Sequence, residues 1–232
     1  MKDFSELEAK LQAKFRDQDL LRQSLVHRSY LNENPGFALP HNERLEFLGD
    51  AVLELVVTEY LYQHYPNPEG ELTNWRAALV NAVMLSSIAS DLGLEDYLYL
   101  SRGEAKDVGT KARQYILANA IEAVIGAIYL DQGMSTAAKF IHREVLVKLP
   151  EVLANKLYLD PKSRFQELAQ DKAGITPHYL VLDEQGPDHA KEFRVGLYIG
   201  DELVAEGTGS SKQEAQVAAA EAGLKTKQWD GE

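Results

Sequence analysis

The chain has 232 residues, a hydrophobic fraction of 45% and no cysteine, which fits two modest globular domains and excludes disulfides and thiolate metal sites. No stretch approaches the roughly 18 apolar residues of a membrane span, and the charged amphipathic start lacks a signal-peptide core, so we expect a cytoplasmic protein. The net charge of −12, with −6 on each side of residue 160, argues against nucleic acid as a partner unless basic residues form a local patch.

Apolar residues with helical spacing fill nearly every segment from residue 4 to residue 151, and strand-like alternation is absent there. One example is the series Leu45, Leu48, Val52, Leu55 and Val56. The pattern predicts an all-α domain over residues 1–152.

The segment Asn42–Asp50 combines helical spacing with acidic side chains. Glu43, Glu46 and Asp50 lie at i, i+3 and i+7, so they form one stripe of the predicted helix. Glu46 and Asp50 are four residues apart, which would allow them to share a cation.

A second predicted helix, over residues 116–130, carries Asn119 and Glu122 within an otherwise apolar run. A carboxylate in such surroundings is costly to bury without a partner. The acids of the two helices could be a solvated helix face, could pair with Arg44 and Arg76, or could form a shared functional site. Two such helices in one chain favour the site.

Both acidic helices contain a glycine, Gly49 in the first and Gly126 in the second. A residue without a side chain lets backbones or ligands approach closely, and helix packing alone would also explain it. Because the chain has no cysteine, carboxylates, amides and imidazoles are its available metal ligands. These favour hard cations such as Mg²⁺.

The chain changes character after a predicted linker at residues 153–159. Asp160 looks like an N-cap followed by Pro161 at the first helical position, and this helix should run to about Lys172. Three strands and an alanine-rich helix are predicted to follow. The strands are Tyr179–Asp183, Glu192–Ile199 and Glu202–Gly209, and the helix is Ser211–Lys225. This order predicts a compact α+β domain, α-β-β-β-α, over residues 160–229.

Long motifs in the first part resemble the ribonuclease III family. NERLEFLGDAVL at 42–53 is similar to the signature helix of that family, and ILANAIEAVIGAIYLD at 116–131 is similar to its second catalytic helix. Further similar segments are LVHRSYLNE at 25–33, GELTNWRAALVN at 70–81 and LGLEDYLYLSRGE at 92–104. The resemblance implies a helical, divalent-metal-dependent endonuclease domain.

The resemblance also assigns roles to particular residues of the first domain. It implies a metal site of Glu46, Asp50, Asn119 and Glu122. Within that set it makes Asp50 and Glu122 catalytic, with Mg²⁺ as cofactor and Mn²⁺ as a possible substitute. It further implies supporting acids at Glu43 and Glu69, and a homodimer in which Phe47 inserts into the partner subunit. The alternative for Phe47 is an ordinary core residue.

Asn119 departs from the family pattern, which has aspartate at this position. An amide oxygen can still bind a hard cation, but one negative charge is lost, so metal affinity should fall. Asn119 could be natural variation in an active enzyme, a step towards a catalytically silent RNA-binding protein, or an engineered change. The persistence of Glu46, Asp50 and Glu122 favours retained activity.

The last third resembles the double-stranded-RNA-binding domain, through DPKSRFQELAQ at 160–170, GPDHAKEFRV at 186–195 and GTGSSKQEAQVAAAEAGL at 207–224. Such domains read duplex RNA through its shape, 2′-hydroxyls and phosphates. The resemblance implies RNA contacts by Gln166, Glu167, His189, Lys212 and Gln213. The family often has two or more basic residues where this chain has Lys212 and Gln213, which predicts modest affinity with a shallow salt dependence.

Together these patterns predict an endoribonuclease that cuts double-stranded RNA and leaves 5′-phosphate and 3′-hydroxyl ends, in RNA processing (ribosomal precursors, messages) and decay. Its partners would be double-stranded RNA and a second copy of the chain, without a membrane or a small-molecule cofactor. One alternative is a double-stranded-RNA-binding protein whose cleavage is weakened or lost because of Asn119. A metal-dependent phosphohydrolase of small substrates is disfavoured by the RNA-binding domain.

Overall fold

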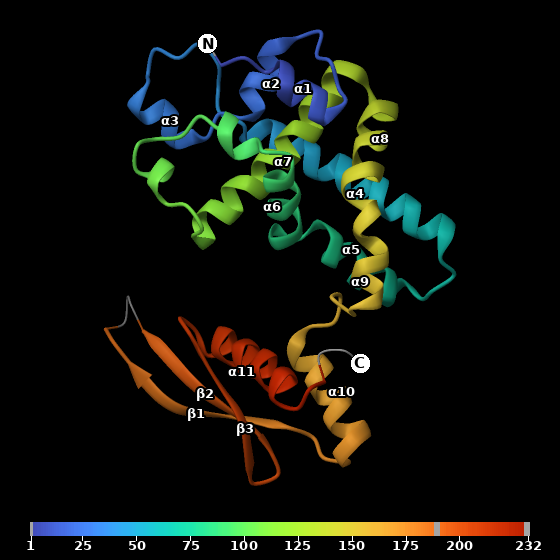
Figure 1. The fold of residues 1–232 in the computed structure, drawn as a ribbon, viewed down its shortest axis with the longest axis vertical. Helices are drawn as coiled ribbons and strands as arrows, with labels where there is room; N and C mark the ends of the chain where they lie inside the picture. The colour runs from blue at the N-terminus through green and yellow to red at the C-terminus, as the bar shows by residue number, and fades with distance from the viewer. Residues whose placement is uncertain (1, 188–190, 230–232) are drawn as a thin grey trace. The chain divides into compact units, whose positions relative to one another are not determined.

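The computed structural model describes residues 2–187 and 191–229 and separates the chain into two compact units, Met1–Leu153 and Ala154–Glu232 (Figure 1). None of the helices in these described ranges is long and apolar enough to cross a membrane.

The described part of the first unit consists of helices and their connections, as the sequence predicts, with one isolated β-bridge between Val26 and Tyr99. Its α-helices are α1 (Ser5–Leu11), α2 (Gln18–Ser24), α3 (Arg28–Glu33), α4 (Glu43–His64), α5 (Glu69–Val80), α6 (Ala82–Asp91), α7 (Lys111–Gln132), α8 (Met134–Glu144) and α9 (Leu149–Ala154). Three short 3-10 helices, η1 (Leu94–Tyr97), η2 (Glu104–Lys106) and η3 (Leu146–Lys148), lie in the connections. The fold class predicted for this unit is therefore confirmed.

Helix α7 is the centre of the first unit, and α2, α4, α6 and α8 pack against it (Figure 1). The side chain of Thr110 caps its start by accepting a hydrogen bond from the backbone N–H of Arg113, and the helix ends at Gly133. The middle of the helix, residues 116–128, is largely buried, which explains why this run is apolar. Asn119 and Glu122 are the polar residues within that run.

The second unit contains α10 (Pro161–Ala173), β1 (His178–Gln185), β2 (Glu192–Ile199), β3 (Glu202–Gly209) and α11 (Lys212–Thr226). The strands form an antiparallel sheet in the order β1-β2-β3. The two helices pack against each other, and α11 also packs on β2 and β3. The core consists of Phe165, Ala169, Leu197, Ile199, Val204, Ala219, Ala220, Leu224 and Trp229.

The predicted elements of the second unit are confirmed, with small shifts of their ends. Asp160 is the N-cap of α10, and its side chain accepts a hydrogen bond from the backbone N–H of Ser163. Ser211 is the N-cap of α11 and not its first residue. Strand β1 is longer than predicted, because a bulge between Val181 and Asp183 shifts the register and pairing with β2 continues to Gln185.

Candidate metal site and RNA-binding surface

Two glycines bring the backbones of α4 and α7 into direct contact. A Cβ atom on Gly49 would lie 1.8 Å from the carbonyl oxygen of Glu122, and one on Gly126 would lie 2.2 Å from the carbonyl oxygen of Leu45. No side chain fits at either position. The close-approach interpretation of both glycines is therefore confirmed, and the acidic stripe of α4 lies against the polar positions of α7.

The contact brings together the four residues predicted to bind the metal. Glu46, Asn119 and Glu122 are partly buried, while Asp50 is exposed. Asn119 forms a side-chain hydrogen bond with Glu46, and the negative charges of Glu46 and Asp50 act on Glu122. We call these four residues the metal cluster.

The carboxyl groups of the metal cluster repel one another in an environment that is partly removed from water. Burial raises the pKa of Glu122 to about 8, and the nearby charges of Asp50, Glu46 and Glu54 add to this effect. The pKa of Glu46 is also raised, first by burial and then by Glu43 and Asp50, although the hydrogen bond with Asn119 opposes the shift. A bound cation would relieve this repulsion, so the donors fit a divalent metal.

The described residues contain no group of three His, Asp or Glu side chains already placed to hold a metal ion. Mg²⁺ does not require such a cage, because it usually keeps several water ligands and binds through one or two carboxylates and the substrate phosphates. The lack of a complete cage among the described residues is therefore compatible with a Mg²⁺ site at this cluster.

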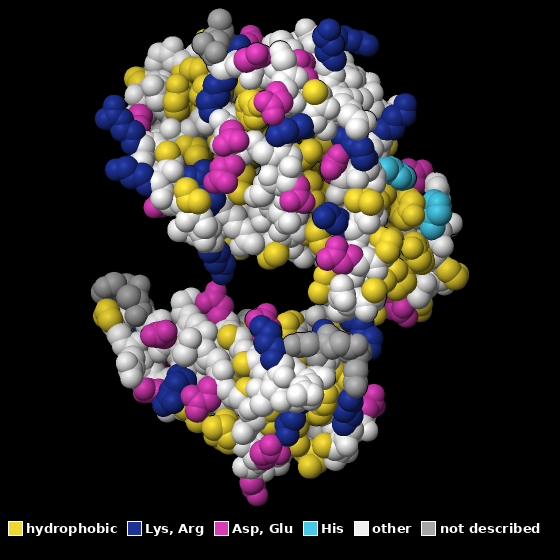
Figure 2. Space-filling model, in the orientation of Figure 1, with side chains coloured by type: hydrophobic (Ala, Val, Ile, Leu, Met, Phe, Trp, Pro, Cys, Tyr) yellow, Lys and Arg dark blue, Asp and Glu magenta, His cyan; other side chains and the backbone are white. Residues whose placement is uncertain are grey.

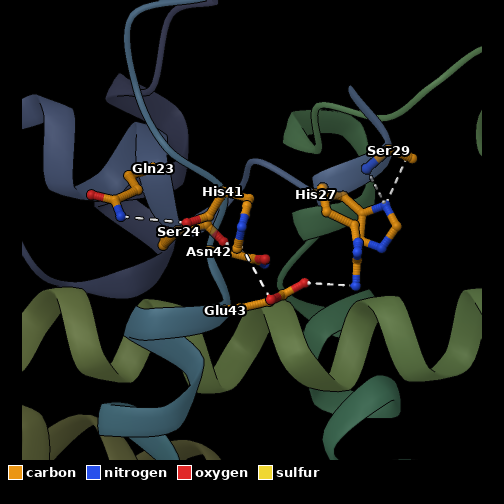
Figure 3. A network of polar contacts seen from close by, with 8 residues as sticks. Gln23, Ser24, His27, Ser29, His41, Asn42 and Glu43 are labelled. Atoms are coloured by element: carbon orange, nitrogen blue, oxygen red, sulfur yellow. Dashed lines mark hydrogen bonds and ion pairs between the residues drawn. The ribbon is translucent and has the colours of Figure 1, made fainter. Parts of the chain in front are cut away.

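Arginines pair with the outer acids of α4. Glu43 lies 3.4 Å from Arg28 and 3.7 Å from His41, the latter contact being visible in Figure 3. Glu54 lies 2.9 Å from Arg76. The sequence analysis considered Arg76 as a partner for the acids of the metal cluster. In the structure Arg76 pairs instead with Glu54, which the sequence analysis did not identify.

Glu69 is exposed in the first turn of α5 and does not join the metal cluster. No hydrogen bond or ion pair links it to the cluster within the described ranges. It instead lines a cavity of about 450 Å³ with Arg76 between α4 and α5. The other lining residues are Thr58, Leu61, Tyr62, Asn67, Leu72 and Thr73.

Phe47 lies one residue beyond Glu46 on α4 and is 80% exposed. An aromatic side chain exposed to this degree is not part of the core of the unit. The core alternative for Phe47 is therefore wrong, and its side chain is available to a partner.

The RNA contacts predicted on the second unit lie on two helices. Gln166 and Glu167 are exposed on α10, while Lys212 and Gln213 are exposed in the first turn of α11. His189 lies outside the described residues. On the visible face, acidic and basic side chains are interspersed on each unit (Figure 2). The visible face therefore shows no extended basic patch, and the local patch stays a prediction.

Comparisons with known proteins agree with both units. The family described as "Ribonuclease-III-like" matches residues 17–149, and "Double-stranded RNA binding motif" matches residues 161–227. The chain belongs to the ribonuclease III family. Ribonuclease 3 of Syntrophomonas wolfei is 47% identical over 90% of this chain and 89% of its own length, and ribonuclease 3 of Dehalococcoides mccartyi is 42% identical over 97% and 94%.

A solved structure supports the same assignment for the helical unit. The nuclease domain of ribonuclease III from Campylobacter jejuni is 40% identical, with a TM-score of 0.57 over 64% of this chain and 99% of that domain. As a ribonuclease III, the chain is an endoribonuclease whose family works with a divalent metal, and its second unit is a double-stranded-RNA-binding domain.

Sequence reasoning missed one residue near the metal cluster. Glu54 lies one helical turn beyond Asp50 on α4, and its charge acts on Glu122. The spacing of four residues after Asp50 is a signal that the sequence contained. That signal alone does not show the pairing with Arg76, which requires the packing of α5.

Proposed function

We propose that this chain hydrolyses phosphodiester bonds of double-stranded RNA with Mg²⁺, or Mn²⁺ as a substitute, held by Glu46, Asp50, Asn119 and Glu122. The observation that carries the proposal is the contact of Gly49 with the backbone of Glu122, which sets the acids of α4 against those of α7. Oxygen donors of this kind suit a hard cation.

The residues of the metal cluster have separable tasks in the proposed reaction. A divalent cation held by the metal cluster would supply a nucleophilic water at neutral pH and would stabilise charge on the attacking and leaving oxygens. Asp50 is exposed and therefore accessible to the phosphate of a duplex at this surface. Burial raises the pKa of Glu122 to about 8, which favours the protonated carboxyl in the metal-free protein, and a cation held there would favour the charged form. Asp50 and Glu122 are the proposed catalytic residues, and the products carry 5′-phosphate and 3′-hydroxyl ends.

Glu43 and Glu69 have supporting roles in this proposal. Glu43 is paired with Arg28 and contributes charge to the surroundings of Glu46. Glu69 lines the cavity beside α5, near the same helix. Neither is proposed as a metal ligand.

The proposed RNA-binding residues are Gln166 and Glu167 on α10, His189, and Lys212 and Gln213 at the start of α11. Lys212 combines its own charge with the backbone N–H groups of a helix N-terminus, which suits a phosphate. We place the endonuclease domain at 1–152, the linker at 153–159 and the RNA-binding domain at 160–229.

The proposed active form is a homodimer in which Phe47 inserts into the partner subunit. The exposure of this side chain supports the proposal. The Campylobacter jejuni nuclease domain supports it as well, because that structure is described as having a flexible region involved in dimer formation. The cytoplasmic location stays a prediction from the sequence.

Incubation of the purified chain with long double-stranded RNA and Mg²⁺ tests the proposal, with Glu122→Gln as the matched inactive variant and single-stranded RNA as the substrate control. We expect the duplex to be cut by the wild type alone, and Mn²⁺ to replace Mg²⁺. Uncut duplex that is still bound in a mobility-shift assay would overturn the cleavage proposal and support the RNA-binding alternative.

A further inference from the structure

The stripe of acids on α4 extends beyond the residues that sequence reasoning identified. Glu46, Asp50 and Glu54 follow one another at intervals of four residues, so neighbouring side chains lie about one helical turn apart. Within the described part of the chain, arginines pair with Glu43 before this series and with Glu54 at its end. No lysine or arginine there pairs with Glu46, Asp50 or Glu122. The metal cluster is thus left without a protein counter-charge.

Arg76 is held at two points by α4. Its Nε atom lies 2.9 Å from Oε2 of Glu54, and its Nη1 atom donates a hydrogen bond of 3.0 Å to Oγ1 of Thr58, one turn further along the helix. Both side chains of the ion pair are about two-thirds buried, at 32% and 37% exposure. A guanidinium fixed by two acceptors cannot readily turn away, so the charge of Glu54 is neutralised in place.

Glu54 is close enough to the metal cluster for its charge to matter. It lies one helical turn beyond Asp50 on the same face of α4, and its ion pair with Arg76 at 2.9 Å holds its carboxylate there. An unpaired Glu54 would therefore add a negative charge beside the cluster, while an unpaired Arg76 would add a positive one. Divalent cations respond strongly to either, because the interaction scales with their charge.

We propose that Arg76 and Glu54 are a positioning pair that sets the charge around the metal cluster, with Arg76 neutralising the acid next to Asp50 so that the cation interacts with Glu46, Asp50 and Glu122 alone. This inference rests on the proposed function. It assigns to α5 a role in tuning metal affinity in addition to its packing.

The pair differs from an ordinary structural ion pair in the sign of its effects. Removal of either partner from a structural pair disturbs the same contact, so both variants should change metal affinity in the same direction. In a charge-setting pair, Glu54→Gln leaves Arg76 unneutralised and weakens cation binding. Arg76→Gln leaves Glu54 unneutralised and tightens it.

Calorimetric titration of the full chain with Mn²⁺ distinguishes these two roles, with the wild type, Glu54→Gln, Arg76→Gln, the double variant and Arg76→Lys compared in one buffer. We expect the Kd to rise roughly three- to tenfold in Glu54→Gln and to fall by a similar factor in Arg76→Gln. The double variant and Arg76→Lys should lie within about twofold of the wild type, because the charge balance is restored in both.

Arg22→Gln is the matched control, because Arg22 forms an ion pair at 2.7 Å with Asp19 of its own helix, α2, and not with an acid of α4. Shifts of the same sign in both single variants, or shifts no larger than that of Arg22→Gln, would overturn the inference while leaving the proposed function intact. A wild type that neither binds Mn²⁺ nor cuts duplex RNA would overturn both. Thermal unfolding of each variant shows whether the titrated protein is folded.

Discussion

Asn119 stands where the resemblance to the family leads us to expect aspartate, and its contacts in the structure indicate what an amide changes at this position. Its side chain forms a hydrogen bond with Glu46 that favours the charged form of that carboxyl. An aspartate there would replace the hydrogen bond by repulsion. The amide therefore lowers the electrostatic repulsion within the metal-free cluster, and it also weakens the attraction of the cluster for a cation.

The variant Asn119→Asp should bind Mn²⁺ roughly tenfold more tightly and cut duplex RNA at lower Mg²⁺ concentrations, because a fourth carboxylate joins the cluster. Metal titrations of the cleavage rate measure this. Asn119→Ala is the control, since it removes the oxygen donor and should raise the metal requirement. An unchanged requirement in both variants would show that position 119 does not contact the cation.

The raised pKa of Glu122 predicts how the stability of the metal-free protein depends on pH. Its pKa is about 8 in the folded chain against an ordinary value of 4.5, so the folded state binds the proton more tightly. This contribution to stability is fully present below pH 4.5 and is lost as the pH rises through about 8. We expect it to be on the order of 3 kcal/mol, after allowance for solvent screening of a group that is partly exposed.

Chemical denaturation in the presence of a chelator, from acid to alkaline pH, measures the contribution of Glu122. The variant Glu122→Gln has no carboxyl group to titrate at this position, so its free energy of unfolding should fall less between acid and alkaline pH. Wild type and variant with the same pH profile would refute the prediction. Mg²⁺ should reduce the alkaline loss of the wild type, since metal binding favours the charged carboxylate.

At the scale of elements, the pairing of α4 with α7 determines whether a metal cluster exists at all. A methyl group at Gly49 or Gly126 would meet backbone atoms of the other helix, which cannot move aside as a flexible side chain does. Gly49→Ala and Gly126→Ala should each destabilise the fold by about 2–4 kcal/mol. Cleavage should fall as well, because the helices must separate.

Gly70→Ala is the control for these two variants. Gly70 lies in α5, and a Cβ atom there would have no neighbour within 4 Å. Alanine favours a helix over glycine, so this change should be neutral or slightly stabilising. Denaturation curves and cleavage assays of the three variants measure the changes in stability and activity. Equal effects at all three positions would contradict the close contact between α4 and α7.

Much of each element followed from local patterns, whereas contacts between elements did not. The acids of α4 and α7 stand at helical spacing in runs that are otherwise apolar, so their type and face could be predicted. The pair Glu54–Arg76 joins residues 22 positions apart on two helices, and no local pattern fixes which acid an arginine meets. The length of β1 was missed because a bulge is not visible in alternating hydrophobicity.

At the scale of the whole molecule, the exposed Phe47 tests the proposed dimer contact. A phenylalanine that is 80% exposed adds little to the stability of its own subunit. Phe47→Ala should therefore leave the free energy of unfolding of the monomer within about 0.5 kcal/mol of the wild type. Sedimentation should show dimerisation weakened by roughly a hundredfold, because two copies of the side chain lose their burial. Val147→Ala, at an unrelated exposed site, should leave both quantities unchanged.

The charge of the molecule limits how the RNA-binding domain can act. The chain carries −12 overall, so long-range attraction to RNA is absent and binding depends on a few local cations. Lys212 is the cation at the start of α11, and its Nζ atom lies 5.6 Å from the centre of the Phe193 ring. The neighbouring Gln213 contributes no charge.

Each phosphate neutralised by the protein adds roughly one unit to the slope of log affinity against log salt concentration. The wild type should therefore show a shallow slope of about two to three between about 50 and 200 mM salt. Lys212→Gln should lower the slope by about one, and Gln213→Lys should raise it by about one. Lys225→Gln changes an exposed lysine at the other end of α11 and should leave it unaltered. A steep slope in the wild type, or equal slopes for the Lys212 and Lys225 variants, would show that the phosphates are bound elsewhere.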